Sequence, residues 1–379
     1  MPRRSRRQLP VAKFLMLVAT LAPTSGCGLQ TAGHHRPGEV RDYTLRTTVS
    51  IHEDVEYRLS LPNSYDPSTP GPLLMHHHGW GESRSSPSGS EFHQHGKVSG
   101  YAVVSISGYR DGKWWNRRSW NGAGSTQSPR SALGATCLPQ TQNFCYSDSC
   151  GACADNCWWT TCQDSVAQTL AVLAEVVGGH CIDEDRVFST GISNGGTYQF
   201  ALGYDARSSG KFAGIFPIIG SPHAGFVRGL PNGPVPLLAV WGHSDTTMPP
   251  CYNGPGSQGV VDAHTGSADT ALDTAYTGHF YSTARNATSA WAAAAGCTAA
   301  PSYDPCNGVL RNASEGHSFY PVASDTIHCV QWSGCEMGVE VIECIDTRAG
   351  HWSPSNWHDE IWAFMQRSIR PGSSRNGPG

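Results

Sequence analysis

The chain has 379 residues, of which 39% are hydrophobic and 15% are charged, with 43 Gly and 25 Pro. This composition is typical of a globular chain with many loops, and it excludes a coiled coil or a disordered chain. The formal net charge is −4. The first 27 residues contain five basic residues and no acidic ones, so the rest of the chain carries −9. Such an acidic chain has no electrostatic basis for binding nucleic acid.

The first 27 residues are typical of a signal peptide. Basic residues precede the apolar run FLMLVATLA, Phe14 to Ala22, which is too short to cross a bilayer. Small residues follow, and Cys27 leaves a second possibility, a lipoprotein signal, although Thr24 stands where a bulky aliphatic residue is usual. We therefore expect export, with membrane attachment only if Cys27 is lipidated. A flexible lead is expected at 28–40 and a flexible tail at 371–379.

Between these ends, strand patterns alternate with helix patterns. Residues 41–62 predict an antiparallel strand pair. Further strands are expected in GPLLMHHHGWGES, YAVVSISG, RVFST, FAGIFPIIG, VPLLAVWG and GVEVIECIDT, and helices in DSVAQTLAVLAEVVGG, GGTYQFALGYD, ATSAWAAAAG and NWHDEIWAFMQRS. This alternation predicts a mostly parallel central sheet with helices on both faces. We expect one catalytic domain over 41–370, with insertions near 116–162 and 251–280.

One short motif falls between a predicted strand and a predicted helix. Gly191-Ile192-Ser193-Asn194-Gly195 is a Gly-x-Ser-x-Gly pattern, which a chain this rich in glycine shows by chance about half the time. The strand–turn–helix context is the one that a nucleophile elbow requires. We therefore predict that Ser193 is a nucleophile and that the Asn194 N–H faces an oxyanion.

A serine nucleophile needs a base, and an α/β-hydrolase supplies an acid and then a histidine later in the chain. Asp245 follows the strand VPLLAVWG, and His351 follows the last predicted strand. We assign Asp245 as the acid and His351 as the base, because catalytic groups gather at the carboxyl ends of strands. The alternatives are the loop histidine His243, the strand histidine His328, and His358 and Asp359 in the last helix. Three acids of the polar insertion could also replace Asp245: Asp262, Asp269 and Asp273.

The stretch HHHGWGES contains three consecutive histidines, His76 to His78. Alternate side chains of a strand point to opposite faces, so the three cannot converge on one metal ion. We expect no metal and no cofactor. A His-Gly-x sequence after a strand instead predicts an oxyanion loop, with the Trp80 N–H as its donor.

Fourteen cysteines in an exported chain indicate disulfides. Six of them cluster between residues 137 and 162 and include a CxxC, which leaves a zinc site as the minor alternative. Five tryptophans flank the cluster: Trp114, Trp115, Trp120, Trp158 and Trp159. Ordinary packing and an aromatic surface for sugar or phenolic rings are both open for them.

Four segments in this order, HHHGWGES, CIDEDRVFSTGISNGG, VWGHSDTTMPP and AGHWSP, resemble the secreted polyhydroxybutyrate depolymerase and feruloyl esterase family. The resemblance covers about Val55 to Ser368. It implies an α/β-hydrolase with disulfide-stapled insertions that hydrolyses carboxylic esters, and it carries over Ser193, Asp245 and His351 as the triad. It also implies a Cys297–Cys335 disulfide and suggests Cys329–Cys344.

The departures from the family concern the substrate pocket. Trp352 follows His351 directly, TTMPP replaces a valine-proline-tyrosine, and the cysteine-rich insertion is long. We expect Trp115, Trp120 and Trp352 to contact substrate. The expected substrate is a polymeric or polysaccharide-linked ester, above all a feruloyl ester. Alternatives are a polyester such as polyhydroxybutyrate, an acetylxylan, and a catalytically silent carbohydrate-binding protein on the same fold.

Overall fold

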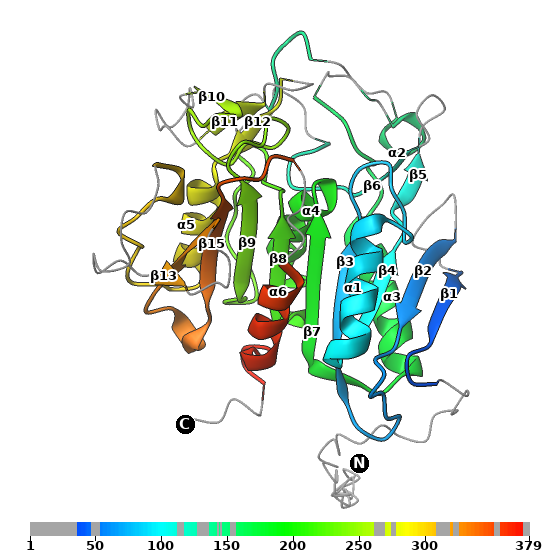
Figure 1. Cartoon of the computed structure of the whole chain (residues 1–379). Coiled ribbons are helices and arrows are strands. Elements are labelled where there is room, and N and C mark those ends of the chain that lie inside the picture. Colours follow the sequence, from blue (N-terminus) through cyan, green and yellow to red (C-terminus); the bar gives the residue numbers. More distant parts are fainter. Residues whose placement is uncertain are drawn as a thin grey trace, which may run out of the picture.

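A computed structural model describes residues 36–46, 54–111, 117–126, 136–141, 144, 146–151, 157–260, 270–273, 278–307, 319–320, 326–351 and 357–373. Its centre is a ten-stranded sheet in the order β1-β2-β4-β3-β7-β8-β9-β15-β14-β13 (Figure 1). The strands are β1 (Val40–Leu45), β2 (Val55–Ser60), β3 (Gly71–His77), β4 (Ala102–Ile106), β7 (Ile182–Ile192), β8 (Gly214–Ile218), β9 (Leu237–Gly242), β13 (Phe319–Tyr320), β14 (Ile327–Trp332) and β15 (Val341–Asp346).

The six middle strands, from β4 to β15, pair in parallel, and antiparallel strands flank them on both sides. The mostly parallel sheet and the antiparallel β1–β2 pair are therefore confirmed.

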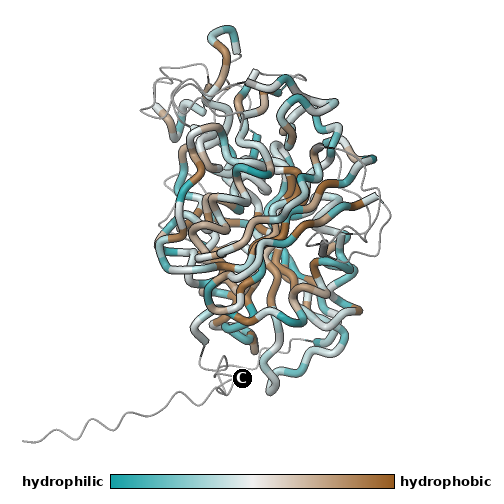
Figure 2. The backbone as a smooth tube through the Cα atoms, turned by 90° about the vertical axis from the view of Figure 1, so that its left-hand side faces the viewer, coloured by the Kyte–Doolittle hydropathy of each residue, from teal (hydrophilic) through white to brown (hydrophobic). Residues whose placement is uncertain are grey.

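Helices cover both faces of this sheet (Figure 1). The helices α1 (Pro87–Ser99) and α6 (Trp357–Arg367) lie on one face, and α3 (Ser165–Gly179), α4 (Asn194–Tyr204) and α5 (Ala284–Ala294) lie on the other. Successive strand residues feed the two layers in turn: Leu73 and Met75 pack with α3–α5, whereas Leu74 packs with α1 and α6. Burial on both faces explains the continuous apolar runs of these strands, which form the hydrophobic centre in Figure 2.

One helix and two insertions differ from the sequence-based expectations. Helix α1 was not expected because it is polar and contains Gly89 and Gly96, yet Ser86 caps its start, Pro87 opens it and Gly100 ends it. Insertion 251–280 is more than a polar loop, since β10 (Ser257–Val260), β11 (Thr270–Asp273) and β12 (Phe280–Ser282) pair into a small sheet. Insertion 116–162 carries β6 (Arg117–Ser119), which pairs with β5 (Tyr109–Asp111), and the short helix α2 (Ser147–Cys150).

Every cysteine in the described part of the chain is disulfide-bonded. The bonds whose two partners are both described are Cys137–Cys157, Cys150–Cys162, Cys251–Cys306, Cys297–Cys335 and Cys329–Cys344. The last two are the pairs that the family resemblance implied. Cys27 lies outside the described residues, as do the proposed signal, most of the lead and most of the tail. None of the described helices has the length and apolar character needed to cross a bilayer.

This architecture is that of an α/β-hydrolase. The strands run in parallel with helices on both faces, and the tight β7–α4 connection lies in the middle of the sheet. Loops at the carboxyl ends of β3, β7, β9 and β15 all leave the same edge, which is where this class of fold places its ligands.

Candidate active site

The turn between β7 and α4 holds Ser193 in a strained conformation. Its backbone has φ 56° and ψ −117°, a region that non-glycine residues rarely occupy. A Cβ on Gly191 would overlap the Gly195 carbonyl, and one on Gly195 would overlap the His77 carbonyl on β3. Only glycine fits at these two positions, so the two motif glycines let the chain turn sharply and present the Ser193 hydroxyl.

Three loops bring a serine, a histidine and an aspartate into line. Ser193 Oγ lies 2.8 Å from His351 Nε2, and His351 Nδ1 lies 2.8 Å from Asp245 Oδ2. The Asp245 side chain is fully buried, whereas 24% of the His351 side chain is exposed. Asp245 Oδ1 also accepts the backbone N–H groups of Thr247 (2.8 Å) and Met248 (2.9 Å). These bonds fix the carboxylate so that its second oxygen faces the imidazole.

Beside Ser193, the backbone N–H groups of Trp80 and Asn194 have no acceptor among the described residues. Asn194 is the first residue of α4, where N–H groups lack helical partners. The loop after β3 approaches the serine so closely that a Cβ on Gly79 would lie 3.7 Å from the Ser193 Cβ. The Gly79 N–H donates to Glu82 Oε2 (3.0 Å), so the next N–H, that of Trp80, is the one left to meet a ligand.

A cavity of about 620 Å³ opens over Ser193 and His351. Its apolar wall consists of Trp80, Phe144, Trp159, Met248 and Tyr281, which pack together. Both indole N–H groups are bonded to protein atoms: Trp80 Nε1 donates to Tyr146 Oη (2.5 Å) and Trp159 Nε1 to His223 Nε2 (2.8 Å). This wall therefore presents apolar surface and no free indole N–H to a ligand, and the cavity suits an apolar or aromatic group.

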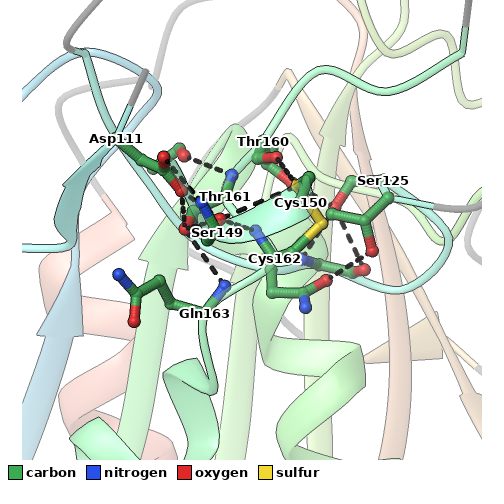
Figure 3. The surroundings of a disulfide bond; sticks show 12 residues. Asp111, Ser125, Ser149, Cys150, Thr160, Thr161, Cys162 and Gln163 are labelled. Carbon is green, nitrogen blue, oxygen red and sulfur yellow. Dashed lines mark hydrogen bonds between the residues drawn. A yellow bond between two sulfur atoms is a disulfide. The ribbon is translucent and has the colours of Figure 1, made fainter. Parts of the chain in front are cut away.

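The stapled insertion supplies part of this wall. In Figure 3 the Cys150–Cys162 disulfide lies within a polar network, in which Thr161 Oγ1 donates to Asp111 (2.9 Å) and Ser125 Oγ meets Thr160 Oγ1 (2.6 Å). The neighbouring Trp159 N–H donates to the Ser125 carbonyl (3.2 Å). Trp159 is therefore held through both its backbone and its side chain.

One expected substrate contact lies elsewhere. Trp120 is fully buried in the core, stacks on Tyr198 and does not line the cavity, so its assignment to substrate contact was wrong. The sequence around Trp120 has no regular hydrophobic pattern, so it gave no sign of this burial. Trp115 and Trp352 lie outside the described residues. Trp120 instead supports the elbow, because its N–H donates to Asn194 Oδ1 (2.8 Å) and its carbonyl accepts Asn194 Nδ2 (3.0 Å).

None of the alternative acids and bases that the structure describes is bonded to Ser193 or His351. His358 on α6 lies near Glu91 (3.7 Å), and Asp273 on β11 lies near His279 (3.8 Å). His328 is on β14, and Asp262 and Asp269 are outside the described residues. His76, His77 and His78 bond to separate partners, Ser105, Thr169 and Gly108 respectively. The described residues contain no cluster suited to a metal ion.

Sequence reasoning missed most of the apolar wall. Phe144 belongs to the first insertion, whereas Met248 and Tyr281 flank the second, more than 100 residues further along the chain. No local pattern marks them as neighbours. The single available signal was the aromatic content around the cysteine cluster, which includes Trp159.

Comparisons with known proteins give a partial picture. No family model matches the chain. A 79-residue stretch is 33% identical to a protein of Nocardia uniformis subsp. tsuyamanensis named "Putative esterase NocK", and it covers 21% of this chain and 22% of that protein. The match thus spans about a fifth of the curated relative.

Solved structures with a similar arrangement are distant in sequence. An S-formylglutathione hydrolase from Agrobacterium tumefaciens is 12% identical over 56% of this chain and 79% of its own, with a TM-score of 0.38. A thermostable esterase is 14% identical over 56% of this chain and 49% of its own, with a TM-score of 0.35. Likeness at this level carries no argument about activity.

Proposed function

We propose that the chain is an exported serine carboxylesterase that forms an acyl-enzyme on Ser193. The observation that carries this proposal is the Ser193–His351–Asp245 hydrogen-bond chain, with both bonds at 2.8 Å. The two acceptor-free N–H groups beside the serine add the anion site that acyl transfer needs. A protein that only binds carbohydrate has no use for all of these groups together.

The geometry supports the following steps. His351 Nε2 takes the proton as Ser193 Oγ attacks the ester carbonyl carbon, and Asp245 holds the Nδ1 proton and stabilises the imidazolium. The oxygen of the tetrahedral intermediate accepts hydrogen bonds from the N–H groups of Trp80 and Asn194. Each of these bonds stabilises the transition state by about 3 kcal/mol. The C–O bond to the alcohol then breaks, and His351 gives that oxygen the proton. A water molecule, deprotonated by His351, then attacks the acyl carbonyl carbon in the same way. The bond to Ser193 Oγ breaks, His351 returns the proton to that oxygen, and the acid is released.

The cavity favours an aromatic acyl group. Its wall of Trp80, Phe144, Trp159, Met248 and Tyr281 matches the face of a cinnamate-type ring better than it matches an acetyl group, which would leave most of about 620 Å³ unfilled. On this basis we propose feruloyl esters of plant cell-wall polysaccharide as substrates. The disulfide density agrees with an extracellular place of action.

The test combines labelling with a substrate panel. A fluorophosphonate probe should label wild type but not Ser193→Ala. Ser189→Ala is the matched control, because Ser189 lies on the same strand and its hydroxyl has no partner in the described structure. Wild type should hydrolyse methyl ferulate in preference to acetylated xylan, short polyhydroxybutyrate and nitrophenyl acetate. Labelling of Ser193→Ala, or hydrolysis of none of the four, contradicts an esterase; preference for the polyester contradicts the feruloyl assignment.

A further inference from the structure

The oxyanion loop depends on the orientation of one peptide unit. The Gly79 carbonyl and the Trp80 N–H belong to the same planar trans peptide, so they point in opposite directions. Any group that holds the Gly79 oxygen therefore sets the direction of the Trp80 N–H.

The group that holds this oxygen is the imidazole of His78. His78 Nδ1 lies 2.6 Å from the Gly79 carbonyl oxygen, and the Gly108 N–H donates to His78 Nε2 at 2.9 Å. A backbone N–H can only donate and a carbonyl can only accept, so Nε2 is the acceptor and Nδ1 carries the proton. The two neighbours thus fix one tautomer.

The environment of His78 also keeps the ring neutral. The side chain is fully buried, and this burial, together with the charge of Arg118, lowers the pKa of His78 to about 4 despite the opposing effect of the Gly79 bond. At neutral pH the ring consequently has one donor and one acceptor, and both are used.

We propose that His78 is a positioning residue that aims the Trp80 N–H at the oxyanion through its bond to the Gly79 carbonyl. This inference rests on the proposed esterase function. His78 touches no reacting atom: its ring lies behind the loop, buried against Trp120, and is not among the residues that line the cavity.

Other contacts hold the loop itself in place. Trp120 Nε1 donates to the His78 carbonyl (3.0 Å), and Gly195 packs against the carbonyls of His77 and His78. A change of the His78 ring should therefore leave the loop beside Ser193 but release the Gly79–Trp80 peptide to rotate. Substrate binding in the ground state would persist, whereas stabilisation of the transition state would fall.

Two substitutions distinguish the roles of the two ring nitrogens of His78. In His78→Asn the side-chain amide can replace Nδ1 and still donate to Gly79, whereas in His78→Gln the amide oxygen can replace Nε2 and accept the Gly108 N–H. With nitrophenyl acetate we expect kcat of His78→Gln to fall by about tenfold to a hundredfold with little change in KM, and His78→Asn to retain most of the activity. A trifluoromethyl ketone, whose adduct with Ser193 carries an oxyanion, should bind His78→Gln more weakly by a similar factor.

The control is His93→Gln. His93 is also a buried histidine, bonded to Ser60 (2.7 Å) and not among the residues that line the cavity. The His93→Gln variant should have a lower melting temperature than wild type but an unchanged kcat. The positioning role is wrong if wild type is active and His78→Gln keeps its kcat and its affinity for the ketone, or if His78→Asn and His78→Gln lose equal activity. Wild type that neither hydrolyses the ester nor reacts with a fluorophosphonate would instead overturn the proposed function, and this inference with it.

Discussion

The Asp245→Asn substitution isolates the role of the buried acid. Asp245 Oδ1 accepts two backbone N–H groups, and Oδ2 faces His351 Nδ1. In the variant the amide oxygen keeps the two loop bonds, since an amide nitrogen placed there would meet two donors. The NH₂ group then faces His351 and requires Nδ1 to be an acceptor, which moves the ring proton to Nε2. That nitrogen can no longer take the proton of Ser193.

Because the loop bonds survive, the variant should fold with nearly wild-type stability. The wrong tautomer should lower kcat by about 10⁴-fold, which corresponds to about 5 kcal/mol of transition-state stabilisation. Initial rates with nitrophenyl acetate at pH 8, and a thermal melt of the same sample, measure the two effects. Asp273→Asn is the control, because Asp273 is also a buried acid near a histidine but neither lines the cavity nor bonds to His351. If both variants lose activity equally, or if Asp245→Asn stays active, the assignment of the acid is wrong.

Three further outcomes follow from the structure. Trp159→Ala removes an aromatic wall, so kcat/KM for methyl ferulate should fall about tenfold while nitrophenyl acetate is affected less; equal losses would contradict a role in selecting the acyl group. Arg285→Ala leaves the fully buried Glu343 without its cationic partner at 2.8 Å, although Thr288 still donates to the carboxylate, and should destabilise the fold by about 3–5 kcal/mol in urea unfolding. Glu343→Gln in the same chain should partly reverse this effect. Burial lowers the pKa values of His77, His78 and His93 to about 3, 4 and 4. When the pH falls below about 6.5, these histidines therefore take up protons in the unfolded chain but stay neutral in the folded chain. Stability should therefore be full above pH 6.5 and decline towards pH 4, by about 1.4 kcal/mol per pH unit for each histidine; a flat melting temperature between pH 7 and 5 would contradict this.

Patterns that are local in sequence predicted much of the fold. The central strands are buried on both faces and are therefore continuous apolar runs, and the Gly191–Gly195 motif requires a strand before it and a helix after it. The order of Ser193, Asp245 and His351 along the chain then restricted the acid and the base to strand ends. The structure places Ser193 and Asp245 each within hydrogen-bonding distance of His351, at its two ring nitrogens.

Features that depend on contacts between distant segments were not predictable in this way. Trp120 and Trp159 both belong to the aromatic group beside the cysteines, yet one is core and the other lines the cavity. The difference arises from tertiary partners, Tyr198 for Trp120 and His223 for Trp159, which no spacing rule relates to them. Helix α1 was missed for another reason, since its polar sequence hides the apolar stripe on which helix prediction depends, and only its caps mark it.

The site divides into two parts with different supports. Ser193, Asp245 and His351 follow strands of the central sheet, so the hydrogen-bond chain is held by the most deeply packed part of the molecule. The apolar wall instead depends on contacts between the two insertions: Leu138 N–H donates to the Gly278 carbonyl and Phe280 N–H to the Thr136 carbonyl, while Cys137–Cys157 closes the first insertion beside Trp159. Because Phe144 and Trp159 belong to the first insertion and the triad follows strands of the sheet, substitutions at these two wall positions can change the acyl group that fits without displacing the catalytic atoms. Under the proposed function, the disulfides that staple the first insertion therefore stabilise the part of the wall that selects the acyl group more directly than they stabilise the triad.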